Sequence, residues 1–188
     1  MPHRKTYNLA LNYVITVKLP AGIKVKRLDH FAVVVKDLKE YIRRYWDLLG
    51  IGPWNIYYLA PPAHKETYLR GNAVKCSIKV GLARLGDISY ELIEPVEGPS
   101  ALKEFLERKG EGMHHFACRY DSLESVRSAV DAFRSAGIEV LQCGKFHDSL
   151  YYYLDTEALL GTIYEILYMP SEITPNEVYP LGRWYKLG

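Results

Sequence analysis

LDHFAVVVKDLKEYIRRYW, at residues 28–46, is repeated later in the chain as MHHFACRYDSLESVRSAVD, at residues 113–131. The two stretches align without gaps, and His30 matches His115 near the start of each. Each begins with a strand-like run that contains His-Phe-Ala and continues into an amphipathic helical pattern. Self-similarity of this kind predicts two copies of one supersecondary unit.

Both helical patterns carry signals for their ends. In the first, Asp37 is a natural N-cap with Glu40 three residues later, and Gly50 can end the helix. In the second, Ser122 takes the cap position and Gly137 can end the helix. Three strand-like segments follow each helix: WNIYYLA, AVKCSIKVGLAR and ISYELIEP in the first half, and IEVLQCG, SLYYYLD and TIYEILYM in the second.

The last segments of the two halves also match. SYELIEPV (89–96) and IYEILYMP (163–170) share a Tyr-Glu-apolar core, so Glu91 corresponds to Glu165. Each half therefore predicts the order strand, helix, strand, strand, strand, with a histidine at the start of the first strand and a glutamate inside the last. The fold class that follows is α+β, built from two repeated βαβββ modules.

These modules divide the chain into five expected parts. They are an N-terminal extension (1–25) with a possible edge strand near Tyr13 to Val17, the first module (26–96), a linker with a short helix (97–111), the second module (112–170) and a C-terminal extension (171–188).

Composition limits the classes of function. The 24 basic and 22 acidic residues leave a net charge of only +2, which makes no strong electrostatic case for binding nucleic acid or an anionic membrane. No apolar run approaches the roughly 20 residues of a membrane span. Three widely spaced cysteines argue against a disulfide framework. We therefore expect a globular cytoplasmic protein.

The repeated histidines and glutamates suggest a metal site between the halves, with His30, Glu91, His115 and Glu165 as ligands. Imidazole and carboxylate ligands suit one divalent ion of Co, Ni, Mn, Zn or Fe, and the absence of cysteine argues against a closed structural zinc site. Taken alone, a histidine or glutamate on a strand is more often structural or solvent-facing. Recurrence of both positions in both halves favours the metal site.

Strand alternation assigns the neighbouring residues to faces. Arg119 shares the face of His115 and could bind a substrate carboxylate, although a salt bridge to a neighbouring acid fits equally well. His114 is expected on the opposite face, in a structural role. Further candidates for substrate binding are Tyr152 and Trp54. Tyr152 faces opposite to the tyrosines on either side of it, so at least one ring of the tyrosine run should line the pocket.

Other candidates carry weaker signals. His64 and His147 lie in loop-like contexts and are expected to be solvated. Glu66 is a possible catalytic acid, but a solvated loop position is the simpler interpretation.

The motifs DHFAVVVKDL, GMHHFAC, YELIEP and YEIL resemble the vicinal oxygen chelate superfamily, which includes glyoxalase I, bleomycin-resistance proteins, extradiol dioxygenases and methylmalonyl-CoA epimerase. The resemblance covers about residues 26–170. The run GPSALKEFLERKGEGMHHFAC is most similar to the epimerases, whereas the aromatic segment before Glu66 and the three tyrosines from Tyr151 depart from their pattern.

This resemblance implies a cupped, partly open barrel around a divalent metal, a homodimer, and a small-molecule carbonyl or acyl-thioester substrate. It implies the same four ligands, and an isomerase or epimerase in which Glu165 or Glu91 is the base that removes a proton next to a carbonyl. The alternatives are a glyoxalase I-like lyase, an extradiol-type dioxygenase, or a non-catalytic binding protein of the bleomycin-resistance type. A fourth protein ligand at Glu91 disfavours the dioxygenase.

Overall fold

The computed structural model describes residues 27–180. The edge strand expected near Tyr13 to Val17 lies outside these residues. The helices are α1 (Leu38–Leu49), α2 (Ala101–Lys109), α3 (Leu123–Ser135) and α4 (Glu157–Leu160). The strands are β1 (Leu28–Val34), β2 (Trp54–Leu59), β3 (His64–Leu69), β4 (Asn72–Ala73), β5 (Ser77–Leu85), β6 (Ile88–Glu97), β7 (Gly112–Arg119), β8 (Val140–Phe146), β9 (Ser149–Leu154), β10 (Ile163–Tyr168) and β11 (Glu177–Tyr179).

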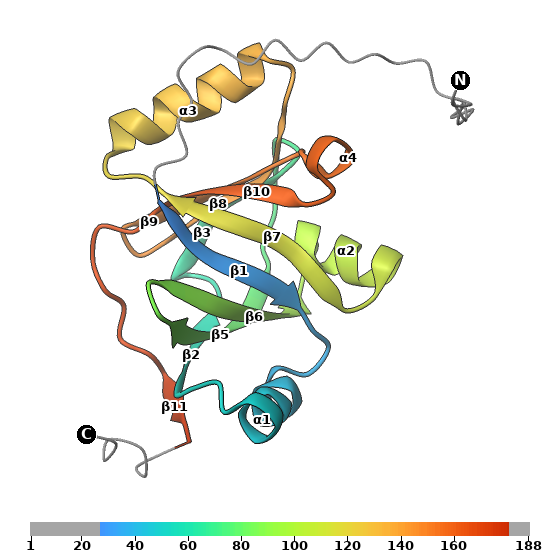
Figure 1. Ribbon diagram of the computed structural model, residues 1–188. Coiled ribbons are helices and arrows are strands. Elements are labelled where there is room, and N and C mark those ends of the chain that lie inside the picture. The colour runs from blue at the N-terminus through green and yellow to red at the C-terminus, as the bar shows by residue number, and fades with distance from the viewer. Residues whose placement is uncertain (1–26, 181–188) are drawn as a thin grey trace, which may run out of the picture.

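All the described strands join one mixed sheet in the order β11-β2-β5-β6-β1-β7-β10-β9-β8-β3-β4. The sheet curls into an open half-barrel with helices outside it, which confirms the α+β class (Figure 1). The central pair, β1 and β7, is antiparallel, and each of these strands has a parallel neighbour, β6 beside β1 and β10 beside β7. The strands that begin and end each repeated pattern therefore meet at the centre of the sheet.

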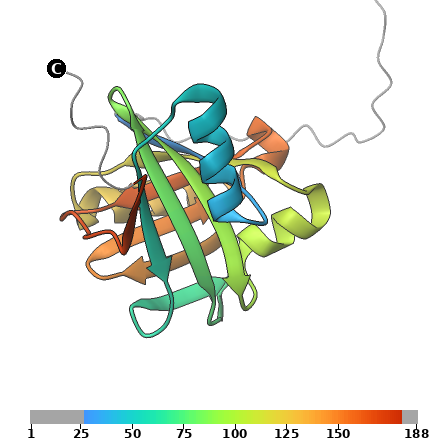
Figure 2. The same cartoon turned by 90° about the horizontal axis from the view of Figure 1, so that it is seen from below.

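The repeated helices pack on opposite ends of the sheet (Figure 1). Asp37 caps α1 through a 2.9 Å hydrogen bond from the backbone N–H of Glu40, and Gly50 ends the helix in the left-handed conformation, with φ of 67°. Leu38 and Ile42 then pack on the first half of the sheet, which α1 crosses in Figure 2. The corresponding face of α3 packs on the second half through Val126, Val130 and Phe133. Both amphipathic patterns thus form the predicted helices, and the apolar faces of these helices pack on the sheet.

One segment leaves the half in which the sequence places it. After β2 the chain crosses to the far edge of the sheet, where β3 pairs with β8 and β4 pairs with β3. The sequence predicts a loop around His64 and Glu66, because the polar letters HKETYL carry little strand signal, and the structure corrects this prediction. The C-terminal region crosses in the other direction, since β11 follows β10 in the chain but pairs with β2. These two crossings tie the halves together.

Candidate metal centre

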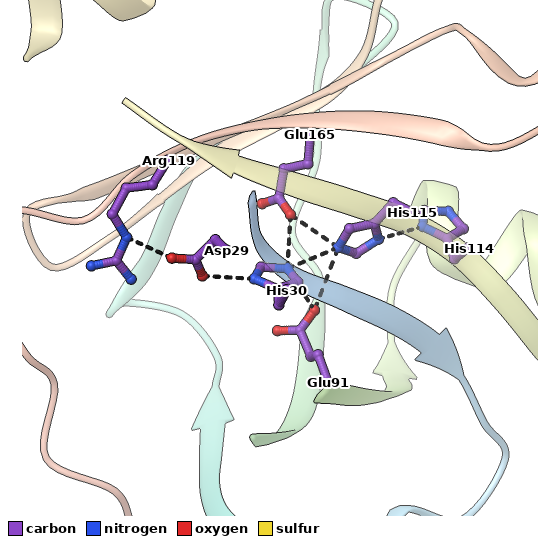
Figure 3. A network of polar contacts seen from close by, with 7 residues as sticks. All are labelled: Asp29, His30, Glu91, His114, His115, Arg119 and Glu165. Carbon is purple, nitrogen blue, oxygen red and sulfur yellow. Dashed lines mark hydrogen bonds and ion pairs between the residues drawn. The ribbon is translucent and has the colours of Figure 1, made fainter. Parts of the chain in front are cut away.

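Strand pairing brings the four predicted ligands to the middle of the sheet. Glu91 on β6 lies beside Ala32 of β1, and Glu165 on β10 lies in the equivalent place beside Ala117 of β7. The antiparallel pairing of β1 with β7 then sets Ala32 beside His115. The alanines leave space on the inner face for the longer side chains next to them. All four candidate ligands are buried and converge in Figure 3.

The ligand atoms lie at the spacing of a coordination sphere. Glu165 Oε2 is 3.1 Å from Nε2 of His30 and 2.9 Å from Nε2 of His115. Glu91 Oε2 is 3.2 Å and 3.4 Å from the same two nitrogens, and the nitrogens are 3.3 Å apart. Bonds of about 2.0–2.2 Å to one ion would place neighbouring ligand atoms about 3 Å apart.

Within this cluster the two glutamates are not equivalent. Glu165 Oε2 lies closer than Glu91 Oε2 to the Nε2 atoms of both histidines. Glu91 approaches the imidazoles from the other side (Figure 3). Moreover, Glu165 Oε2 is buried without a hydrogen bond although both Nε2 atoms are close to it. Such an atom fits a metal ion better than a hydrogen-bonded network.

Charge balance also fits a cation. Burial alone would lower the pKa of both histidines, but the charge of Glu91 and a hydrogen bond with Asp29 raise the pKa of His30 well above its usual value. Glu165 is the main group that raises the pKa of His115 against burial. Burial would likewise raise the pKa of each glutamate, but the histidines hold both pKa values below the usual range. The two buried carboxylates therefore favour positive charge between them, which a divalent ion would supply.

A β-bulge beside each histidine holds its second nitrogen. The pairing of β1 with β7 slips by one residue at two places, and the extra residues are Asp29 on β1 and His114 on β7. Asp29 Oδ1 accepts from Nδ1 of His30 at 3.0 Å, and His114 Nδ1 lies 2.8 Å from Nδ1 of His115. Bulges often re-aim side chains beside functional sites. Both ligands are therefore oriented by the residue that precedes them.

Strict alternation predicts that His114 points away from the site, and this prediction is wrong. The bulge breaks the alternation, so its buried ring contacts those of His115, Phe105 and Tyr153. Burial, and then the neighbouring His115, lower the pKa of His114 well below its usual value, so the ring is neutral. A histidine that offers Nε2 to a metal carries hydrogen on Nδ1. In that state Nδ1 of His115 donates a hydrogen bond to Nδ1 of His114.

Of the two roles expected for Arg119, the structure shows the salt bridge to a neighbouring acid. Its Nε donates to Oδ2 of Asp29 at 2.7 Å, while the other oxygen of that carboxylate faces His30 (Figure 3). Burial would raise the pKa of Asp29, but His30 and Arg119 outweigh it and lower the pKa. The Asp29 carboxylate is therefore charged, and it links Arg119 to the candidate metal centre.

A cavity of about 690 Å³ opens beside this cluster and is lined by His30, Glu91 and Glu165. Apolar residues of several strands form much of the remaining wall, and three arginines also line it. The apolar residues include Leu59, Ile78, Val80, Leu82, Ile93 and Leu167, and the arginines are Arg27, Arg84 and Arg119. The centre is thus reachable by a small molecule that has both an apolar and a negatively charged part.

Two predicted pocket residues lie elsewhere. Tyr151 and Tyr153 line the cavity, whereas Tyr152 packs with the α3 cluster on the outer side of the sheet. The alternation of the tyrosines was correct, but the choice of the inward ring was wrong. Trp54 is fully buried in the core beneath α1, and its indole N–H donates to the carbonyl of Ile51 at 2.6 Å. It fills the core and does not line the cavity.

Two minor expectations have opposite outcomes. Glu66 is exposed and pairs with Lys145, in line with the simpler interpretation of that residue. His64 is not solvated: it is 3% exposed on β3 and bonded to Tyr151. The sequence carried no sign of this burial, because the strand that holds His64 pairs with the other half of the sheet.

The model of the Glyoxalase/Bleomycin resistance protein/Dioxygenase superfamily matches residues 29–153. The uncharacterized protein YqjC of Bacillus subtilis (strain 168) is 32% identical over 93 residues, which are 50% of this chain and 56% of that protein. Mitochondrial methylmalonyl-CoA epimerase of Mus musculus is 30% identical over 103 residues, 54% of this chain and 50% of that one. The chain thus spans about half the length of the curated relatives it matches.

Solved structures share the fold. A variant of Streptomyces coelicolor methylmalonyl-CoA epimerase, in complex with 2-nitronate-propionyl-CoA, superposes with a TM-score of 0.54 at 19% identity and covers 79% of this chain and 100% of its own. None of the described helices is long and apolar enough to cross a membrane.

The family match confirms the resemblance read from the repeated motifs: the chain belongs to the glyoxalase/bleomycin resistance protein/dioxygenase superfamily.

Proposed function

We propose that this protein is a divalent-metal-dependent isomerase or epimerase that removes a proton from the carbon next to a substrate carbonyl. The observation that carries the proposal is the convergence of His30, Glu91, His115 and Glu165, with nitrogen–oxygen distances of 2.9–3.4 Å, beside an open cavity. Buried opposite charges of this kind are costly unless a function retains them.

The roles follow from the inequality of the two glutamates. His30, His115 and Glu165 would hold the ion, because Glu165 Oε2 is the carboxylate oxygen closer to both imidazoles and is buried without a hydrogen bond. The bound ion would supply Lewis-acid stabilisation of negative charge on the carbonyl oxygen. Glu91 approaches the imidazoles from the side opposite to Glu165 (Figure 3) and lines the cavity, so its carboxylate would accept the α-proton. Asp29 and His114 would keep the two imidazoles in the orientation that presents Nε2.

The substrate class follows from the cavity and the relatives. Methylmalonyl-CoA epimerase is the name of the mouse relative, and the Streptomyces enzyme binds an acyl-CoA analogue. In this chain the apolar wall would hold an acyl group, and arginines at the cavity would attract a negatively charged substituent. We therefore infer that the substrate is an acyl thioester with a branched or acidic acyl group. We also propose that the protein acts in the cytoplasm as a homodimer.

A second candidate function has one observation in its favour. Two histidines and one glutamate, here His30, His115 and Glu165, make up the ligand set of non-haem iron oxygenases. An extradiol-type dioxygenase would therefore keep Glu91 away from iron. Oxygen uptake with catechols after anaerobic loading with Fe(II) would identify that reaction.

The test of the proposal combines metal analysis with proton exchange. Purified protein should contain close to one divalent ion per chain by inductively coupled plasma mass spectrometry. In D2O it should introduce deuterium next to the carbonyl of an acyl-CoA substrate. For the stereoisomer whose α-proton faces Glu91, Glu91→Gln should slow this exchange by about 100-fold or more while keeping the metal, and the exposed Glu66→Gln is the matched control. Wild-type protein without near-stoichiometric metal, or exchange of both stereoisomers at the wild-type rate in Glu91→Gln, would contradict the assignment.

A further inference from the structure

A second polar network reaches the cavity and includes a residue of β3. His64, on β3, is buried, and its two ring nitrogens have different partners. Nδ1 lies 3.1 Å from the backbone oxygen of Cys76, and Nε2 lies 3.0 Å from the hydroxyl of Tyr151. β3 pairs with β8, and β8 pairs with β9, which carries Tyr151. These pairings bring His64 close to Tyr151.

The donors and acceptors of this network can be assigned. A carbonyl oxygen only accepts, so Nδ1 of His64 carries the hydrogen and donates to Cys76. Burial lowers the pKa of His64, so the ring is neutral and its Nε2 accepts. Gln142 Oε1 accepts from the backbone N–H of Ala101 at 2.7 Å, so its amide N–H donates to the Tyr151 oxygen at 2.9 Å. The Tyr151 hydroxyl must therefore donate to His64.

Only one member of the His64–Tyr151 pair lines the cavity. Tyr151 shares the cavity wall with His30, Glu91 and Glu165, whereas His64 is not among the lining residues. The Tyr151 ring lies 5.1 Å from that of Tyr153, centroid to centroid. It therefore joins a buried base to the space in which a substrate would bind.

We propose that Tyr151, with His64 behind it, is the second proton-transfer group of this site. The inference rests on the proposed epimerase function, in which a proton leaves one face of a carbon and returns to the other. One residue on one side of the cavity cannot serve both faces of a planar carbon. Glu91 would serve one face, and Tyr151 the other.

The proton transfer balances without an added reactant. The Tyr151 oxygen takes the α-proton, and the electron pair of the broken C–H bond stays on the substrate. The hydroxyl proton of Tyr151 passes at the same time to Nε2 of His64, which becomes an imidazolium that still donates from Nδ1 to Cys76. In this direction Glu91 first takes a proton from water in the cavity that it lines, and then delivers that proton to the opposite face of the substrate carbon. The reverse reaction uses the same groups in the opposite order, with Glu91 as the carboxylate that removes the proton. Gln142 is a positioning residue, because it holds the tyrosine oxygen.

The test separates inversion from exchange. Each stereoisomer of a 2-methyl-branched acyl-CoA is incubated in D2O with the metal-loaded protein, and α-deuterium and inversion are measured independently. In Tyr151→Phe and His64→Gln, inversion should fall by about 100-fold or more, whereas one stereoisomer, whose proton faces Glu91, should still exchange at nearly the wild-type rate. Tyr152→Phe, with its ring outside the cavity, is the matched control.

Other outcomes would overturn the assignment. Inversion within about threefold of wild type in Tyr151→Phe would remove Tyr151 from the reaction. Equal loss of exchange from both stereoisomers, with lower metal content or melting temperature, would show a structural role instead. If the wild-type protein exchanges neither stereoisomer, the proposed function itself fails, and the second proton-transfer group fails with it.

A measurement without turnover tests the same arrangement. Long-range proton–nitrogen NMR spectra should show His64 with hydrogen on Nδ1, and Tyr151→Phe should shift the Nε2 resonance while leaving that tautomer unchanged. Hydrogen on Nε2 in the wild-type protein would contradict the donor assignment and overturn the proposal.

Discussion

The β-bulges at Asp29 and His114 use one backbone device for two different chemistries. Each bulge turns the residue before a candidate ligand toward Nδ1 of that ligand, at 3.0 Å in the first half and 2.8 Å in the second. The first partner is a carboxylate anchored by Arg119, and the second is a neutral imidazole packed among aromatic rings. The repeat thus preserves the geometry around the ligands more closely than the identity of the supporting residue.

This difference has an electrostatic consequence. Asp29 brings a negative charge close to His30, which favours positive charge on that ring and on any ion bound to it. His114 contributes no charge and acts through orientation and burial alone. The two halves should therefore respond alike to loss of a ligand, and differently to substitutions that keep a hydrogen-bond acceptor beside the ligand but change its charge.

The largest expected effect is loss of a ligand from either half. We expect His30→Ala and His115→Ala to weaken metal binding similarly, because the two imidazoles occupy equivalent positions in the repeat. Three ligands that share about 10–16 kcal/mol contribute about 4 kcal/mol each, or more than about 100-fold in affinity. Competition with a chromogenic chelator measures this loss, and the exposed His147→Ala is the control. Full affinity in one of the two variants would break the equivalence of the halves.

An intermediate effect should come from the supporting residues. Removing either side chain, in Asp29→Ala or His114→Ala, should lower metal affinity by about 10–100-fold. Asp29→Asn and His114→Gln sharpen the comparison, because both keep an oxygen that can accept from Nδ1 while only the first removes a charge. Titration calorimetry should show weaker binding in Asp29→Asn and nearly full affinity in His114→Gln. The reverse order would show that charge is not what distinguishes the two supports.

The smallest expected effect is that of Tyr152→Phe, because this ring packs on the outer side of the sheet. Substrate KM and metal affinity should both stay within about twofold of wild type, and the free energy of unfolding should change by about 0.5 kcal/mol or less. Steady-state kinetics and urea unfolding provide these values. A several-fold rise in KM would return Tyr152 to the cavity and contradict its placement.

The local sequence predicted the parts of the fold that depend on local rules. The caps at Asp37 and Ser122 and the apolar stripes of both helices follow from hydrogen bonding and periodicity within a few residues. The repeat also identified the four side chains that the structure brings together, because equivalent positions in two copies of one unit meet at their shared centre. The alignment also places Asp29 and His114 at equivalent positions of the repeat, although alternation assigns His114 to the wrong face.

What this sequence determined by itself is the repeated unit, its helix ends and the positions of its candidate ligands. Tertiary structure decided the rest: which tyrosine faces inward, where the bulges turn Asp29 and His114, and that β3 crosses to β8 and buries His64. Alternation along a strand gives relative facing only, and the inner face is known once the sheet curls. Pairing between distant strands depends on how the whole sheet closes, so no short stretch of residues could specify it.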